Sequence, residues 1–404
     1  MSPQAPPTPE ELQRVLDELD PLDHDDSFLW APREAFRDAV IAAIREAIAP
    51  SRRQVLRDYL LGLGPIESIW HGDRPSELAI SASGLVHVRE GGRMVQSPVV
   101  FPDPYRTRIL KSIAARDGKQ LTHQRPLVGV TVGPGERAQL VGGQVSVGGG
   151  ASAVFRRQTL DSPSLELLAE LGSIDKSLVD LLRAEVLRGR NFLVAGDKGS
   201  GKTTFLSALI EATDPAHHVV TMEDVGELKV PASRCVTRLA TRNEGNEGTG
   251  GVDHAALLRA AKRLGADVLV LGEVRGSEAY ALVDALTSAT TGVFGGIHAR
   301  DAQTALDKLA NKAVEGGADP RRVQHQVRTA VDYVVHLLPD LARRPALVGG
   351  VAQMGLQQLA RPVLCGGQLA IEPVVTWVPN VGSAGRWVID DPGPFVEHGL
   401  GQFA

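Results

Sequence analysis

Apolar and polar positions follow two different periods along the chain, and the change of period separates its parts. Over 31–49 and 55–60 apolar residues recur at helical spacing, and the second stretch ends at a Gly-Pro turn. From 66 to 157 short apolar runs are broken by glycine, which predicts strands around a helix over 105–115. The predicted strands span 78–80, 85–88, 99–101, 128–132 and 138–147. We expect a small α+β domain over 51–157, preceded by an extension over 1–50 with a disordered, proline-rich start.

After a linker at 158–163, strand-like runs alternate with amphipathic helical stretches. Strands are predicted over 191–195, 219–222, 236–239, 268–271 and 293–297, and helices over 164–172, 175–188, 253–264, 276–289 and 301–314. This alternation predicts an α/β domain over 158–340 with a largely parallel sheet, covered on both faces. Further strand-like runs at 333–338, 368–378 and 386–389 predict a β-rich C-terminal extension over 341–404.

A glycine-rich segment between a buried strand and an apolar helix fits the pattern G-x-x-x-x-G-K-[ST]. A strand, a glycine turn and a helix N-terminus together gather backbone N–H groups that favour a polyphosphate. In this motif Lys202 reaches the β/γ-phosphates and the Thr203 hydroxyl ligates Mg²⁺. The predicted nucleotide-binding residues are Gly196, Asp197, Lys198, Gly199, Ser200, Gly201, Lys202, Thr203 and Thr204. We therefore predict that the protein binds a nucleoside triphosphate.

The composition of the chain narrows the classes of protein to which it can belong. No run approaches the roughly 20 apolar residues of a membrane span, and the N-terminus lacks a signal pattern. We therefore expect a cytoplasmic protein without direct membrane insertion, whose membrane role is exercised through partners. A net charge of −5 and 4% aromatic residues argue against a groove for single-stranded nucleic acid. The two cysteines, Cys235 and Cys365, are expected to be buried free thiols.

Motifs after the phosphate loop resemble, in order and spacing, those of the secretion traffic ATPases. Residues 221–228 resemble the acidic box, 271–276 the modified second nucleotide motif and 295–299 the histidine box of that superfamily. Two earlier segments, Leu63-Gly64-Pro65-Ile66 and Phe155-Arg156-Arg157, look most like the tight-adherence (Flp) pilus assembly branch. The chain departs from the family at 265–267, Gly-Ala-Asp instead of the frequent Arg-Pro-Asp, and at 197–198 in the phosphate loop.

This resemblance, which covers about residues 51–340, implies a RecA-like P-loop domain that prefers ATP. It implies a homohexameric motor whose ATP hydrolysis powers pilus assembly or protein secretion across the cell envelope. The implied partner is an inner-membrane platform protein, which would hold the motor peripherally at the inner face of the membrane.

Roles for single residues also come from the resemblance. It assigns Glu223 to the attacking water and Glu273 to the Mg²⁺ shell, with an exchange of the two roles left open. His298 is assigned to sensing the γ-phosphate. Asp224 and Glu227 are either functional or solvated carboxylates.

Arginines complete the predicted site. A closed ring places each nucleotide at a subunit or domain boundary, where arginines act as charge-stabilising fingers. Five arginines lie near the motifs: Arg238, Arg242, Arg259, Arg263 and Arg275. Of these five, we predict that Arg242 and Arg275 act as such fingers. The resemblance further places Arg137 and Arg156, with Arg157 beside it, at the nucleotide phosphates.

Two other functions remain open at this point. One is a nucleic-acid translocase or helicase on a RecA-like core, which would need a basic, aromatic pore loop that we do not find. The other is a regulatory module that binds ATP without hydrolysing it, and the presence of both glutamates argues against it.

Overall fold

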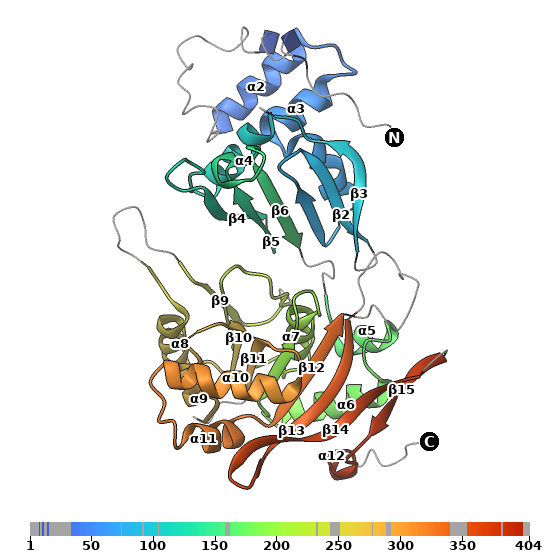
Figure 1. The fold of residues 1–404 in the computed structure, drawn as a ribbon, viewed down its shortest axis with the longest axis vertical. Helices are drawn as coiled ribbons and strands as arrows, with labels where there is room; N and C mark the ends of the chain where they lie inside the picture. Colours follow the sequence, from blue (N-terminus) through green and yellow to red (C-terminus); the bar gives the residue numbers. More distant parts are fainter. Residues whose placement is uncertain are drawn as a thin grey trace. The chain divides into compact units, whose positions relative to one another are not determined.

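The computed structural model forms two compact units, Met1–Thr159 and Leu160–Ala404 (Figure 1). The residues it describes are 8, 10–11, 14–15, 34–73, 75–90, 93–103, 105–133, 135–157, 162–231, 233–242, 251–276, 278–287, 292–339, 354–380 and 383–398. The predicted boundary at 157–158 lies beside the division between the units. The finer division into four parts stays a prediction.

The first unit is built on a six-stranded sheet in the order β3-β2-β1-β6-β5-β4, with every neighbouring pair antiparallel. Its strands are β1 (Glu77–Ile80), β2 (Leu85–Glu90), β3 (Arg93–Val100), β4 (Leu127–Gly133), β5 (Glu136–Val141) and β6 (Ser152–Arg157). Its helical elements are α2 (Glu34–Ala47), α3 (Arg53–Leu61), η3 (Gly64–Ile66), η4 (Ile69–Asp73), α4 (Tyr105–Arg116) and η5 (Gly143–Val145). This arrangement confirms the small α+β domain.

Buried and more exposed residues alternate along these strands, so the sheet has a core face and a polar face. The core face buries Phe155 with Trp70, Phe101 and α4 residues such as Leu110. The strand predicted over 138–147 ends at Val141, because the Gly142 N–H donates to the Pro126 carbonyl and the chain turns into η5.

The second unit contains a nine-stranded sheet in the order β15-β14-β13-β12-β7-β11-β10-β8-β9. Neighbours from β12 to β9 pair in parallel, and those from β12 to β15 pair antiparallel. The parallel strands are β7 (Phe192–Gly196), β8 (Val219–Glu223), β9 (Val236–Ala240), β10 (Val268–Val274), β11 (Val293–His298) and β12 (Tyr333–Pro339). The predicted parallel sheet is confirmed.

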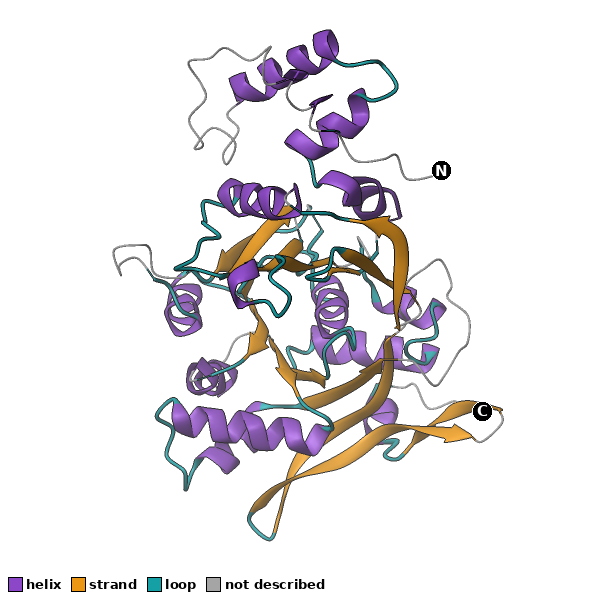
Figure 2. Cartoon of the chain, turned by 45° about the horizontal axis from the view of Figure 1, so that its top comes forward, coloured by secondary structure: helices purple, strands orange, loops and turns teal. Residues whose placement is uncertain are grey.

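Helices cover both faces of this sheet (Figures 1 and 2). One face packs against α8 (His254–Arg263), α9 (Glu278–Thr287), α10 (Ala302–Glu315) and α11 (Val323–Ala330). The other packs against α5 (Leu165–Glu170), α6 (Lys176–Leu187), α7 (Lys202–Glu211) and α12 (Gly393–Glu397). Since successive side chains in a strand point to opposite faces, Val194 joins the second core while Leu193 and Ala195 join the first.

The predicted β-rich C-terminal region extends the same sheet. It supplies β13 (Met354–Cys365), a strand that the periodicity did not reveal, together with β14 (Gln368–Asn380) and β15 (Ser383–Ile389). Both cysteines are exposed, so the prediction of buried thiols is wrong: Cys235 precedes edge strand β9, and Cys365 lies at the β13–β14 turn. Within the described part of the chain, no helix is long and apolar enough to cross a membrane.

Candidate active site

The phosphate loop joins β7 to α7 in a conformation that requires glycine. Gly196 has φ +155°, and a Cβ there would lie 2.4 Å from the Ser200 hydroxyl and 2.5 Å from the Leu337 carbonyl oxygen. Gly201 caps α7 in the left-handed region, with φ +89°. A side chain at either position would be strained, so the glycine pattern reflects the path of the backbone.

Two polar groups of this loop fit a phosphate ligand. Ser200 is fully buried, and its hydroxyl has no hydrogen-bond partner in the structure. The Lys202 ammonium donates to the carbonyl oxygens of Gly196 and Asp197, each at 2.9 Å. Burial lowers the pKa of Lys202 to about 8, against the opposing effect of Glu273 and Asp197. A partly buried cation whose partners include no carboxylate is suited to exchange its carbonyl partners for phosphate oxygens.

His298 connects Lys202 to the carboxylate of Glu273 on β10. In the sheet, β11 lies between β7 and β10. His298 ends β11, opposite Gly196 of β7, and its Nδ1 lies 3.3 Å from Lys202 Nζ. Its Nε2 lies 2.9 Å from Glu273 Oε1. Because an ammonium only donates, Nδ1 accepts and the Nε2–H donates to Glu273, which assigns the tautomer from the network.

Glu273 and Asp224 hold one arginine between them. Arg275 donates to Glu273 at 2.6 Å through Nη2 and to Asp224 through Nη1. Burial raises the pKa of Glu273, but the hydrogen bonds from His298 and Arg275 outweigh it and bring the pKa to about 2. Glu273 is therefore ionised throughout the physiological pH range. The turn after β10 is fixed by Glu278, whose carboxylate accepts from the backbone N–H of Arg275 and Gly276.

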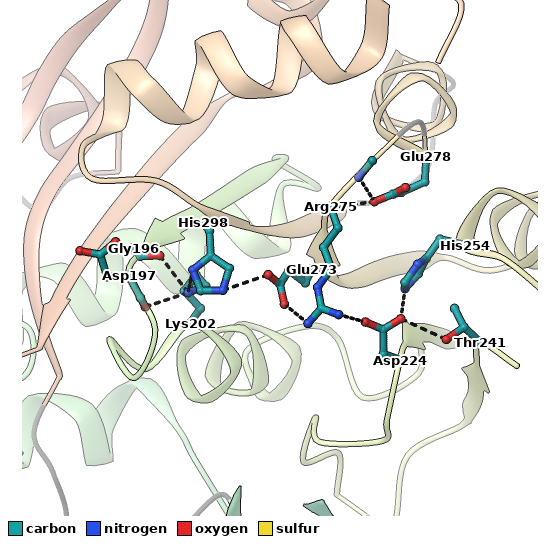
Figure 3. A network of polar contacts seen from close by, with 11 residues as sticks. Gly196, Asp197, Lys202, Asp224, Thr241, His254, Glu273, Arg275, Glu278 and His298 are labelled. Carbon is teal, nitrogen blue, oxygen red and sulfur yellow. Dashed lines mark hydrogen bonds and ion pairs between the residues drawn. The ribbon is translucent and has the colours of Figure 1, made fainter. Parts of the chain in front are cut away.

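These contacts form a continuous strand-end network: Lys202, His298, Glu273, Arg275 and Asp224 (Figure 3). Its members follow β7, β11, β10 and β8 in the order in which those strands lie in the sheet. Parallel strands all end at the same edge, so distant motifs meet there. The network brings the phosphate loop, the histidine box, the second nucleotide motif and the acidic box together.

Glu223 faces a different environment from Glu273. Its side chain is 5% exposed, and Oε1 accepts from the backbone N–H groups of Glu227 and Leu228 at 2.8 Å each. Burial raises its pKa to about 7, although these hydrogen bonds and Arg238, 3.8 Å away, act in the opposite direction. In this structure Glu223 therefore holds the acidic-box backbone.

The other predicted arginines lie on β9, just after it, and on α8. Arg238 donates to the Leu228 carbonyl at 2.8 Å and so holds the acidic box from β9. The backbone of Arg242 forms a two-way bridge with Val252. Arg259 and Arg263 are exposed on α8.

In the first unit the arginines divide between the two sheet faces. Arg156 pairs across the ladder with Arg137 and donates to Glu77 at 3.4 Å. Arg157, by contrast, is buried: its guanidinium stacks 3.6 Å above the Trp70 ring and pairs with Glu136. Arg157 therefore supports the core of the unit, which corrects its predicted place at the phosphates.

Several polar residues near the site were missed by motif reasoning. Thr241 and His254 both approach Asp224, the first at 3.0 Å and the second at 3.6 Å. His336 lies beside the phosphate-loop strand, opposite Ala195, and is buried with Nε2 lacking a partner. No motif marks these positions, because their partners are distant in sequence.

The donor set suits a magnesium ion that is held mainly by phosphate and water. Among the described residues, no group of three or more His, Cys, Asp and Glu side chains could hold a metal ion. Mg²⁺ in nucleotide sites needs only one or two protein oxygens. Thr203, on the first turn of α7, and the ionised Glu273 are such donors.

Comparison with known proteins identifies a family. The family model described as "Type II/IV secretion system protein" matches residues 141–368, more than half of the chain. A Mycobacterium tuberculosis protein named for conjugal transfer is 31% identical over 303 residues, which cover 73% of this chain and 85% of that protein. The type IV secretion system protein PtlH of Bordetella pertussis is 31% identical over 252 residues, covering 56% and 73%.

A solved structure supports the same fold. The pilus retraction motor PilT, crystallised with ADP, aligns with a TM-score of 0.51 at 20% identity, over 78% of this chain and 82% of that one. The family match and these relatives confirm the predicted superfamily and the predicted ATPase function, and they do not single out the tight-adherence branch. The chain belongs to the Type II/IV secretion system protein family and is a secretion-type ATPase.

Proposed function

We propose that this protein is a homohexameric, Mg²⁺-dependent ATPase that powers pilus assembly, and that it is most similar to the tight-adherence branch. The observation that carries the hydrolytic part is the strand-end network, which links the phosphate-loop lysine to an ionised carboxylate through one histidine. The branch assignment is supported by residues 63–66 and 155–157. Within the first of these segments, Gly64 begins η3 with φ +66°, and a Cβ added there would collide with Ile109 and Phe101.

The two glutamates take separate roles in this proposal. The resemblance favours Glu223 for the attacking water and Glu273 for the metal, whereas the geometry favours Glu273 over Glu223 for either role. Glu273 is ionised and joined to Lys202 through His298, whereas Glu223 is occupied by backbone N–H groups. A carboxylate that orients water must be charged and must face the phosphates, so we place Glu273 at the water or the Mg²⁺ shell.

Binding of ATP would reorganise one end of the network. The Lys202 ammonium would leave its carbonyl partners for the β/γ-phosphates, and His298 Nδ1 would lose the donor that it faces now. His298 would then lie next to the γ-phosphate, and in the proposed sensor role Nδ1 must present an N–H to it, because phosphate oxygens only accept. Loss of the γ-phosphate would restore the contact, which makes the two nucleotide states structurally different.

Charge stabilisation is assigned to arginines both inside and outside this network. Arg275 is already held by two carboxylates, and Arg242 lies two residues beyond the end of β9. Arg137 and Arg156 lie side by side on the polar face of the first unit, with Glu77 as a partner of Arg156. We propose that these two contact the nucleotide when the ring assembles. We place the protein at the inner face of the membrane, bound to a platform protein.

The direct test is steady-state phosphate release by the full chain with ATP and Mg²⁺, with the oligomer measured by light scattering. We expect hexamers whose activity is lost in Arg156→Ala and retained in Arg93→Ala, at an exposed arginine of β3. Stimulation of the activity by single-stranded DNA would favour a nucleic-acid translocase instead. Full activity of a monomer would contradict the ring.

A further inference from the structure

The first residue of α8 is a buried histidine that faces the far end of the strand-end network. His254 follows the N-cap Asp253, whose carboxylate accepts from the Ala256 N–H at 2.7 Å. His254 is 9% exposed, and its Nε2 lies 3.6 Å from Asp224 Oδ1 (Figure 3). A helix start thereby touches the acidic box directly.

Asp224 uses its two oxygens toward two different parts of the fold. Oδ1 accepts from the Thr241 hydroxyl at 3.0 Å and faces His254, while Oδ2 accepts from Arg275. Arg275 in turn donates to Glu273 at 2.6 Å. Since about half of the Arg275 side chain is exposed, its position depends on its two carboxylate partners.

Both groups that face Oδ1 lie next to one backbone bridge, between Arg242 and Val252. Arg242 and Val252 exchange backbone hydrogen bonds of 2.9 and 2.8 Å. Thr241 immediately precedes this bridge and His254 follows it by two residues. Asp224 therefore contacts the residue that follows β9 and the first residue of α8, so displacement of α8 would act on Asp224 and Arg275.

We propose that His254 is a positioning residue for ATP hydrolysis, which seats Asp224 and so keeps Arg275 against Glu273. It touches neither Glu273 nor the phosphate loop, and acts only through Asp224 and Arg275. The contact couples the N-terminus of α8 to the carboxylate at the nucleotide site. This proposal rests on the proposed function, because its main readout is ATP turnover.

The first experiment compares three variants of the full chain in steady-state ATP hydrolysis. We expect His254→Ala to lower kcat about tenfold, a typical effect of losing an outer-shell partner, and to leave the dissociation constant for ATP unchanged. His254→Gln, whose amide reaches a position near that of Nε2, should restore most of the rate. The matched control is His325→Ala, at an exposed histidine of α11, which should behave as wild type. Equal losses in the Ala and Gln variants would refute a role through Asp224.

A double-mutant cycle separates positioning from a general structural effect. If His254 acts through Arg275, then combining His254→Ala with Arg275→Ala should lower kcat no further than Arg275→Ala alone. If the two losses in kcat instead multiplied in the double variant, His254 would support the fold independently of Arg275. That result would overturn the proposal.

Hydrogen exchange supplies a readout that does not depend on turnover. A non-hydrolysable ATP analogue should change the exchange of α8 first-turn amides in wild type and should not in His254→Ala. The same response in both would overturn the coupling. If wild type hydrolysed no ATP, the proposed function would fail, and this measurement would still decide the role of His254.

Discussion

Replacing Glu223 with glutamine removes a buried ionisable group without changing its shape. The carboxylate oxygen Oε1 accepts from two backbone N–H groups, and the amide oxygen of glutamine can accept the same pair. What the substitution removes is the cost of ionising a buried acid, which raises the pKa of Glu223 to about 7. The variant should therefore be more stable than wild type above the pKa of the unfolded chain, where folding of the wild type must either neutralise or bury the glutamate charge.

The magnitude and its pH dependence follow from the two pKa values. Folded Glu223 has a pKa of about 7, against a model value of 4.5 for an exposed glutamate. Its neutral form contributes stability that is fully present below the unfolded pKa and is lost as pH rises through the folded pKa. The glutamine variant should exceed wild type by about 1 kcal/mol near pH 5 and by about 3 kcal/mol near pH 8.5.

Urea-induced unfolding of the full chain, followed by far-UV circular dichroism at both pH values, measures the difference. The matched control is Glu315→Gln, at an exposed glutamate in the last turn of α10, which should show no such pH dependence. A variant that is less stable than wild type near pH 8.5 would refute the reasoning. It would mean that the backbone N–H groups and Arg238 stabilise the ionised form more than burial destabilises it.

Four further substitutions test other parts of the structure. Lys202→Ala should abolish ATP binding in a fluorescent-nucleotide titration, and unaltered turnover would exclude this phosphate cradle. Glu273→Gln should bind ATP yet lose about a hundredfold or more in kcat; a wild-type rate would move the catalytic carboxylate elsewhere. Gly296→Ala would place a Cβ 2.2 Å from the Gly272 carbonyl oxygen, so we expect a lower melting temperature and a loss of about 1–3 kcal/mol. Phe395→Ala, at a fully buried ring, should cost about 3–5 kcal/mol in urea unfolding without weakening ATP binding.

Features that depend on neighbouring residues were predictable from the sequence. The phosphate loop needs glycine wherever its backbone adopts a positive φ, so its conformation is written into positions 196, 199 and 201. Alternating strands and helices likewise imply a parallel sheet with two covered faces, because each helix must bury one apolar side. The sequence pattern did not predict β13, and the strand predicted over 138–147 is too long. The ends of both strands are set by turns and by pairing with strands distant in sequence.

The contacts between the motifs were decided by the tertiary structure. The motifs lie in the sequence in the order β7, β8, β10, β11, whereas the sheet places β11 between β7 and β10. This order puts His298 between Lys202 and Glu273, and it leaves Arg275 to reach Asp224 on β8. A side chain at a strand end points toward whichever strand lies beside it, and no local pattern records that neighbour. The sequence by itself therefore determined which groups the site contains, and the strand order determined which of them meet.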